Sequence, residues 1–299
     1  MDLISIERKY KNIRNIIIIS FVIVMLVIIA LIIIEQYQKQ NENKIYLSYK
    51  EQCKEAAEKE KIKKEESKKA RLEALKAKLP KLTDEGRKNI KNIYHSETKR
   101  VFLTFDDGPS TNVTPLILDT LKQENIKATF FVLGSRVELS PEITKRAFEE
   151  GHFIASHGYS HKYSQIYSSP SSVIDEYNKS LTAIRNAIGI QEYNPHLFRY
   201  PGGYWGGKYA NIKKQAEQLL AENNIVHVDW NALTSDSAGK STTEEFLAEL
   251  EKTVPKYNSV VVLMHDAGNK KTTAEALPQI ISYFREKGFE FENFYSIIK

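Results

Sequence analysis

The sequence predicts an α/β domain with a largely parallel sheet, preceded by one transmembrane helix and a charged helical stalk. Three observations support this fold class. Residues 16–34 form an uncharged apolar run, Lys and Glu dominate residues 35–96, and short β-rich runs alternate with helical patterns over residues 97–299. Such alternation is typical of a parallel sheet covered by helices. The basic residues 1–15 complete the predicted division of the chain.

The apolar run is long enough to span a bilayer. Apart from Ser20 it contains only apolar residues, and at about 1.5 Å per residue it forms roughly 28 Å of helix, close to the hydrocarbon thickness. A cleaved signal peptide has a shorter apolar stretch and a small-residue cleavage site, whereas Glu35 follows here directly. We therefore expect an uncleaved anchor; a buried soluble helix or a long signal peptide are the alternatives. Basic residues that precede the run predict a cytoplasmic N-terminus and place the rest of the chain outside the membrane: Arg8, Lys9, Lys11 and Arg14.

Charge is distributed unevenly along the chain. Residues 1–100 carry 23 basic and 14 acidic side chains, a net +9, whereas residues 101–299 carry 20 and 24, a net −4. Positive charge thus belongs to the anchor and stalk, and no nucleic-acid groove is indicated. The stalk has too few apolar residues for a sustained heptad seam, so we expect a solvated helix ending near Pro80, with weak coiled-coil pairing as the alternative. Cys53 is the single cysteine, which excludes an internal disulfide and leaves the oligomeric state open.

The C-terminal domain contains seven predicted strands and six predicted helices. The strands are Val101–Phe105, Ala128–Leu133, His152–Ala155, Leu197–Tyr200, Ile225–Trp230, Val260–Met264 and Phe289–Phe291. The helices cover about 115–125, 141–150, 171–188, 208–223, 243–253 and 273–287. Chains of this type place their chemistry at the C-terminal ends of strands, which is where polar clusters occur here.

Two of these clusters contain potential metal ligands. Asp106 and Asp107 directly follow a strand, and adjacent carboxylates there are costly unless a cation neutralises one of them. His157 and His161 are four residues apart, which places them on one side of the segment if it is helical. Two histidines and one carboxylate complete a three-ligand site with positions left for water and substrate. Taken alone, the Asp pair is often a turn and the His pair is often accidental.

Three further clusters follow later strands. Arg199-Tyr200-Pro201-Gly202-Gly203 predicts a tight loop whose backbone N–H groups can point into a site. Asp229 to Ser237 is a second polar stretch, and His265 ends a strand that is expected to be buried. Individually these segments also suit a simple turn or a solvated strand end.

Together the five segments resemble the polysaccharide deacetylase family, which contains chitooligosaccharide, chitin and peptidoglycan deacetylases. The resemblance covers roughly residues 97–295 in order and spacing. It implies a distorted (β/α) barrel and a metal-dependent hydrolase that removes acetyl groups from N-acetylated sugars. It also implies one divalent ion, with zinc favoured, although two histidines and one aspartate also accept cobalt, nickel or manganese.

The resemblance assigns roles around that ion. It makes Asp107, His157 and His161 the metal ligands and Asp106 the general base that takes a proton from the attacking water. Arg199 would pair with Asp106 and hold its orientation and charge.

The remaining roles concern the acetyl group and the leaving amine. The backbone N–H of Gly202 would bind the oxyanion, and Leu263 would line the pocket for the acetyl methyl group. His265 would be the general acid, oriented and kept protonated by Asp236.

Two positions depart from the family pattern. Gly202 stands where the family often has a tyrosine, and Ser237 stands where it commonly has a tryptophan. Tyr204 or Trp205 would cover the first space, and Trp230 would replace the second side chain if the geometry allows. These departures affect the expected substrate cleft rather than the expected chemistry.

A membrane anchor facing the cell wall favours N-acetylglucosamine of peptidoglycan as substrate. N-acetylmuramic acid, chitooligosaccharides and an exopolysaccharide are the alternatives of the same class. A non-catalytic glycan-binding module is the alternative of another class, and it is disfavoured because Asp106, the three ligands and His265 are all present. The sequence has neither the Gly-x-Ser-x-Gly of a serine hydrolase nor the His-Glu-x-x-His of a zincin.

Overall fold

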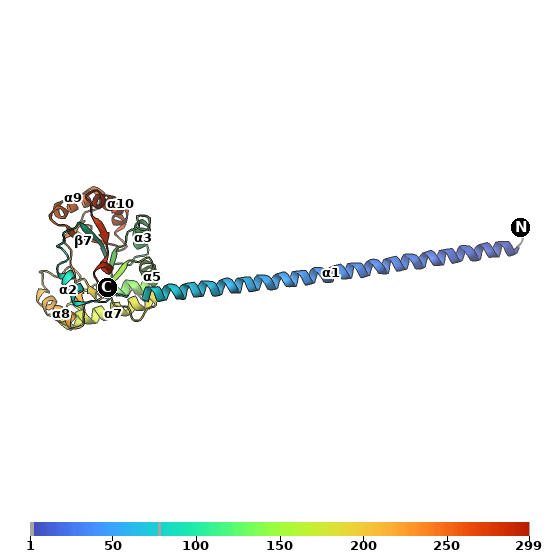
Figure 1. The fold of residues 1–299 in the computed structure, drawn as a ribbon, viewed down its shortest axis with the longest axis horizontal. Helices are drawn as coiled ribbons and strands as arrows, with labels where there is room; N and C mark the ends of the chain where they lie inside the picture. The colour runs from blue at the N-terminus through green and yellow to red at the C-terminus, as the bar shows by residue number, and fades with distance from the viewer. Residues whose placement is uncertain (1–2, 77–78, 299) are drawn as a thin grey trace. The chain divides into compact units, whose positions relative to one another are not determined.

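The computed structural model describes residues 3–76 and 79–298 and divides the chain into two compact units, Met1–Leu72 and Glu73–Lys299. Helix α1 extends from Leu3 to Lys76 (Figure 1), and the first unit consists of this helix up to Leu72. Side chains of residues 11–70 are all exposed, and opposite charges pair along the stalk, as in the 2.7 Å contact between Lys64 Nζ and Glu60 Oε1. The predicted helical stalk is thus a continuation of the predicted anchor helix.

Among the described residues, one helix is long and apolar enough to cross a membrane. It is the N-terminal helix, whose most apolar window has a mean hydropathy of 3.7 and is not buried at all. Ile16–Ile34 expose large aliphatic side chains all around the helix. An apolar surface of this size is rarely left in water, which agrees with the predicted anchor by length and composition.

The second unit is built on a parallel sheet. The strands are β1 (Arg100–Asp106), β2 (Thr129–Val132), β3 (Phe153–Ser156), β4 (Leu197–Phe198), β5 (Val226–His227), β6 (Ala232–Leu233), β7 (Ser259–His265) and β8 (Glu290–Glu292). Their order is β5-β4-β3-β2-β1-β7-β6, with β8 pairing to β1 off this path. No described ladder joins β5 to β6. The predicted distorted (β/α) barrel is confirmed as a curled, open half-barrel.

Strand β1 occupies the centre of this sheet and sets the position of the strand ends. It pairs with β7 along its whole length, from Arg100↔Ser259 to Asp106↔His265. On its other edge, β8 pairs with the first half of β1 and β2 with the second half. Because all these pairs are parallel, Asp106 and His265 lie next to each other at the C-terminal edge.

Helices surround the sheet, with β7 inside them (Figure 1). They are α2 (Asp84–Lys91), α3 (Thr114–Gln123), α4 (Gly134–Leu139), α5 (Pro141–Glu149), α6 (Tyr163–Ile166), α7 (Pro170–Ile188), α8 (Ala210–Glu222), α9 (Thr243–Thr253) and α10 (Lys271–Glu286). Local sequence explains their ends: Ser169 caps α7 by accepting from Ser172 N, and Gly189 ends it in the left-handed conformation, φ 74°. The six predicted helices are all present.

The compact unit begins earlier than the predicted boundary at residue 97. Helix α2 starts at the N-cap Thr83 and carries Ile90 into a core cluster that also contains Ile93 and Phe102. Ile90 and Ile93 are only 3% and 1% exposed. The end of the segment predicted as stalk therefore packs against the sheet, because its two isoleucines cover the start of β1.

Candidate active site

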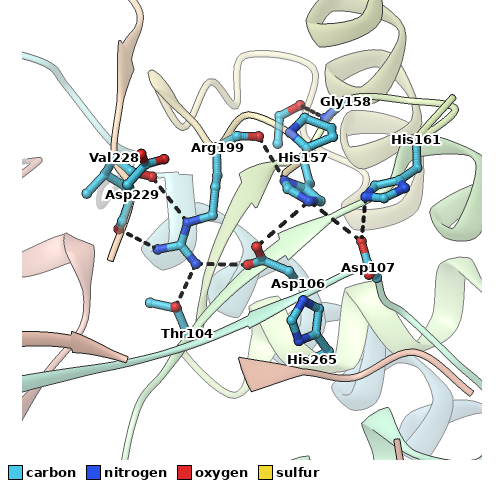
Figure 2. A network of polar contacts seen from close by, with 12 residues as sticks. Thr104, Asp106, Asp107, His157, Gly158, His161, Arg199, Val228, Asp229 and His265 are labelled. Carbon is cyan, nitrogen blue, oxygen red and sulfur yellow. Dashed lines mark hydrogen bonds and ion pairs between the residues drawn. The ribbon is translucent and has the colours of Figure 1, made fainter. Parts of the chain in front are cut away.

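Two adjacent carboxylates leave the end of β1 in different directions. Asp106 is the last residue of the strand and is buried, whereas Asp107 is partly exposed and has φ 77°. A non-glycine residue in the left-handed region is strained and persists only where its surroundings hold it. The turn separates the side chain of Asp107 from the sheet interior and directs it to two histidines (Figure 2).

Asp107, His157 and His161 form a cluster in which one ligand atom from each lies within 4.8 Å of the others. Asp107 Oδ1 is 3.6 Å from His157 Nε2 and 3.3 Å from His161 Nε2. The same oxygen is buried without a hydrogen-bond partner in the described part of the chain. A buried carboxylate oxygen without a protein donor is stabilised by a cation or an ordered water.

The tautomer of His157 suits a metal ligand. Its Nδ1 lies 2.8 Å from the Arg199 carbonyl oxygen, which can only accept, so Nδ1 carries the proton. The lone pair of Nε2 therefore faces the cluster. Burial lowers the pKa of His157 to about 3, which keeps the ring neutral at physiological pH. Together with the orphaned oxygen of Asp107, this donor set fits a divalent ion such as zinc.

The two histidines converge through a loop and not through a helix. Residues 157–161 have no helical structure, Gly158 has φ 83° and His161 has φ 55°. The ring centroids are 5.4 Å apart. The sequence suggested that this segment could be helical, whereas the structure has two residues with positive φ there. The expected convergence of the two histidine side chains is present.

Arg199 holds Asp106 from the side opposite to the histidines (Figure 2). Arg199 is fully buried, and its Nη1 donates to Asp106 Oδ1 at 2.9 Å and to Thr104 Oγ1 at 2.7 Å. Its remaining nitrogens donate to the carbonyl oxygens of Val228 and Asp229. Four of the five N–H groups of the guanidinium are thereby used, so Arg199 is held firmly and orients Asp106.

The second oxygen of Asp106 faces the Asp107–His157–His161 cluster. Asp106 Oδ2 is 3.8 Å from His157 Nε2, and no described residue hydrogen-bonds to it. Burial raises the pKa of Asp106, and the charges of Arg199 and His265 oppose that rise. A carboxylate with a raised pKa is a better proton acceptor than a solvated one.

His265 and Asp236 form a pair across the end of β7. Asp236 Oδ1 lies 2.8 Å from His265 Nδ1, and Asp236 Oδ2 accepts from the backbone N–H of His265 at 2.9 Å and from Thr273 Oγ1 at 2.9 Å. Burial lowers the pKa of His265, but the hydrogen bond and charge of Asp236 outweigh it, so the pKa is raised overall. Nδ1 is committed to Asp236, which leaves Nε2 to carry a transferable proton.

Comparison with known proteins shows what this arrangement is related to. The family profile described as polysaccharide deacetylase matches residues 94–220. A peptidoglycan-N-acetylglucosamine deacetylase of Bacillus cereus is 31% identical over 67% of this chain and 70% of its own length. A CE4 esterase structure from Streptococcus mutans superposes with a TM-score of 0.62 at 33% identity, covering 72% of this chain and 92% of that one. The chain belongs to the polysaccharide deacetylase family.

Relatives in this family differ in length. The peptidoglycan-N-acetylglucosamine deacetylase PgdA of Listeria monocytogenes is 36% identical over 64% of this chain, but the matched part spans only 37% of PgdA. The chain thus corresponds to little more than a third of that relative.

The deacetylase fold also places the residues predicted to contact substrate. Gly202 lies in the loop after β4 with φ 75°, which only glycine adopts readily. Leu263 lies on β7 two residues before His265, on the same face of the strand, and is paired in register with Thr104. Leu263 therefore borders the strand ends that carry Asp106 and His265.

The three aromatic residues predicted near the cleft have different surroundings. Trp230 packs against the core beside Arg199, with its ring 5.8 Å from the guanidinium carbon. Tyr204 stacks on His227 at 4.3 Å, and its hydroxyl donates to Glu217 on α8. Trp205 is 82% exposed. Within the described part of the chain, neither Tyr204 nor Trp205 makes a hydrogen bond or a ring contact with the Asp107–His157–His161 cluster.

Sequence reasoning missed three residues that position this site. Thr104 bridges Arg199 to the Val262 carbonyl oxygen, and Thr273 supports Asp236. Asp266 is buried next to the Asp107–Gly108 turn, where a Cβ on Gly108 would lie 2.0 Å from its Oδ2; burial raises the pKa of Asp266 to about 7. Thr104 is detectable in the sequence as the neighbour of Asp106 on one strand face, whereas Thr273 and Asp266 are defined only by tertiary contacts.

Proposed function

We propose that the protein is a metal-dependent hydrolase that removes acetyl groups from N-acetylglucosamine residues of peptidoglycan outside the membrane. The observation that carries this proposal is the three-ligand cluster of Asp107, His157 and His161, which has Asp106 on one side and His265 close by (Figure 2). A base and an acid beside a metal site are what amide hydrolysis requires.

A divalent ion at this cluster would supply the Lewis acidity that polarises the acetamide carbonyl. The chain's own residues supply the proton transfers. Asp106 Oδ2, which Arg199 leaves free, accepts the proton of the attacking water. The backbone N–H of Gly202 donates to the developing oxyanion. His265 Nε2 then donates a proton to the leaving amine, while Asp236 holds the ring at Nδ1. Acetate and a free amino sugar are the products.

The surroundings of the cluster, the relatives and the apolar helix support the proposed substrate class. Asp107 borders a cavity of about 610 Å³, which Arg136 and Leu139 also line, and this gives a glycan chain room beside the ligands. The named relatives act on peptidoglycan N-acetylglucosamine. The apolar helix at residues 16–34 would hold the domain at the outer face of the membrane, next to the wall. Leu263 would contact the acetyl methyl group.

The test is acetate release by the detergent-solubilised full chain from N-acetylated peptidoglycan and from chitooligosaccharides, with and without a chelator and added zinc. We expect chelator-sensitive release from peptidoglycan. Release from chitooligosaccharides alone would redirect the substrate, and no release from either polymer by zinc-loaded protein would contradict the proposal.

Two variants distinguish the loss of the proposed base from the loss of metal binding. Asp107→Ala removes a ligand, so zinc affinity and activity are lost together. Asp106→Asn keeps the ligands, so zinc still binds while turnover falls by about 10²- to 10⁴-fold. Calorimetric zinc titration and acetate release are measured on both variants. Near-normal turnover of Asp106→Asn would show that another group is the base.

A further inference from the structure

The hydroxyl group of Tyr163 lies over Gly202. A Cβ atom on Gly202 would be 2.5 Å from Tyr163 Oη and 3.1 Å from its Cζ. The two residues come from different segments, since Tyr163 begins α6 and Gly202 lies in the loop after β4. The phenol of Tyr163 therefore occupies the space into which a side chain at position 202 would extend.

Aromatic contacts hold Tyr163 at the edge of the Asp107–His157–His161 cluster. Its ring centroid is 5.6 Å from that of the ligand His161 and 5.7 Å from that of Tyr167. Tyr167 in turn fixes the loop of Gly202, because its hydroxyl donates to the Pro201 carbonyl oxygen at 2.7 Å. Tyr163 itself is 41% exposed. The ring is thus packed against its neighbours, while the residue remains partly exposed to solvent.

Two hydrogen-bond donors at this place have no partner within the described part of the chain. They are the hydroxyl of Tyr163 and the backbone N–H of Gly202; in contrast, the N–H of Gly203 donates to the Tyr200 carbonyl oxygen at 2.8 Å. Unused donors that lie side by side next to a cationic site are the arrangement that stabilises a developing oxyanion. A tyrosine hydroxyl has one proton that it can donate in a hydrogen bond.

We propose that the Tyr163 hydroxyl is a second oxyanion donor, which binds the acetamide carbonyl oxygen of the substrate beside the N–H of Gly202. The inference rests on the proposed deacetylase function. The presence of glycine at position 202 then has a physical reason, because any larger residue there would displace the hydroxyl group of Tyr163. Since negative charge on the carbonyl oxygen grows toward the transition state, the hydrogen bond strengthens there and raises turnover more than substrate affinity.

The test compares Tyr163→Phe with the matched control Tyr209→Phe in the full chain. Tyr209 belongs to the same aromatic cluster, with its ring 6.3 Å from that of Tyr163, so the control removes a hydroxyl from a neighbouring ring. We expect Tyr163→Phe to lower kcat by about 10- to 100-fold, with KM for N-acetylated peptidoglycan changed less than about twofold. Tyr209→Phe should retain the kcat of the parent protein.

Two further readouts keep the result independent of folding and of metal loading. The zinc affinity from calorimetry and the thermal unfolding temperature should be the same for Tyr163→Phe and the parent protein. An unchanged kcat, or an increase in KM alone, would overturn the oxyanion role. If the parent protein binds zinc but releases no acetate, the proposed deacetylase function is wrong. This result differs from failure of the oxyanion role, in which the parent protein is active and Tyr163→Phe has the same kcat.

Discussion

At the scale of residues, the chemistry of this site depends on two adjacent aspartates that have different surroundings. Asp106 and Asp107 are adjacent in the chain, yet Asp106 is buried against Arg199 and Asp107 contacts two histidines. The reason is local: one residue ends a strand and the next has φ 77°. The sequence indicated both carboxylates, but the division between a base and a ligand came from the family resemblance, because no sequence pattern reports a backbone dihedral angle.

Contacts between residues that are distant in the sequence were harder to predict. Tyr163 and Gly202 are far apart in the chain and meet only because α6 and the loop after β4 are adjacent in the fold. The same holds for Thr273 and Asp236. In contrast, the pairing of Asp236 with His265 was expected and is present at 2.8 Å.

That pair gives a prediction for pH dependence. Asp236 raises the pKa of His265 against the opposing effect of burial, and the proposed acid must be protonated to act. Activity is therefore present below the pKa of His265 and is lost as pH rises through it. Asp236→Asn removes the charge, so the pKa falls and the alkaline limb of the kcat/KM profile moves to lower pH. The profile is measured by acetate release across the pH range, with Thr253→Val as a control away from the pair. If the alkaline limb of Asp236→Asn lies at the same pH as that of the parent protein, His265 is not the acid.

At the scale of elements, long periodic segments were predicted best. All six predicted helices and all seven predicted strands are present, but the strands predicted at Leu197–Tyr200 and Ile225–Trp230 are each only two residues long in the structure. The missed elements are short: α4, α6 and β6 contain six, four and two residues. Segments of that length show no measurable periodicity, and their conformation is decided by tertiary contacts. Helix α2 was missed for another reason, since its charged residues continue the composition of the stalk.

Helix α2 also yields a prediction on stability. Ile90 is 3% exposed in the core cluster, whereas Ile62 on α1 is 51% exposed. Ile90→Ala removes packed methylenes and leaves a cavity, which lowers the free energy of unfolding of the second unit by about 2–4 kcal/mol. Ile62→Ala is the same chemical change on an exposed surface and should alter it by less than about 0.5 kcal/mol. Denaturant unfolding of the full chain in detergent, followed by tryptophan fluorescence, measures both; equal effects would show that α2 is not part of the folded core.

At the scale of the whole molecule, charge and hydropathy divide the chain into the same two parts as the structure does, but with a later boundary. Positive charge and the apolar run lie in residues 1–100, which include α2 of the second unit, and the net acidic remainder forms nearly all of the sheet and its other helices. The sequence predicted this division because composition changes abruptly along the chain. The exact start of the compact unit was not predictable, since it depends on which isoleucines of a Lys-rich segment find an apolar surface.

The apolar helix leads to a prediction about location. Residues 16–34 expose only apolar side chains apart from Ser20, so the full chain should remain in the membrane pellet after an alkaline carbonate wash, whereas a chain without residues 1–34 should be in the supernatant. Because Arg8, Lys9, Lys11 and Arg14 precede the helix, the enzyme domain should be on the outer side. Protease added to intact spheroplasts would then digest the domain while a cytoplasmic marker protein stays intact. A domain that is cleaved only after the membrane is permeabilised would place it inside, where it has no access to the wall, and would contradict the proposed substrate together with the topology.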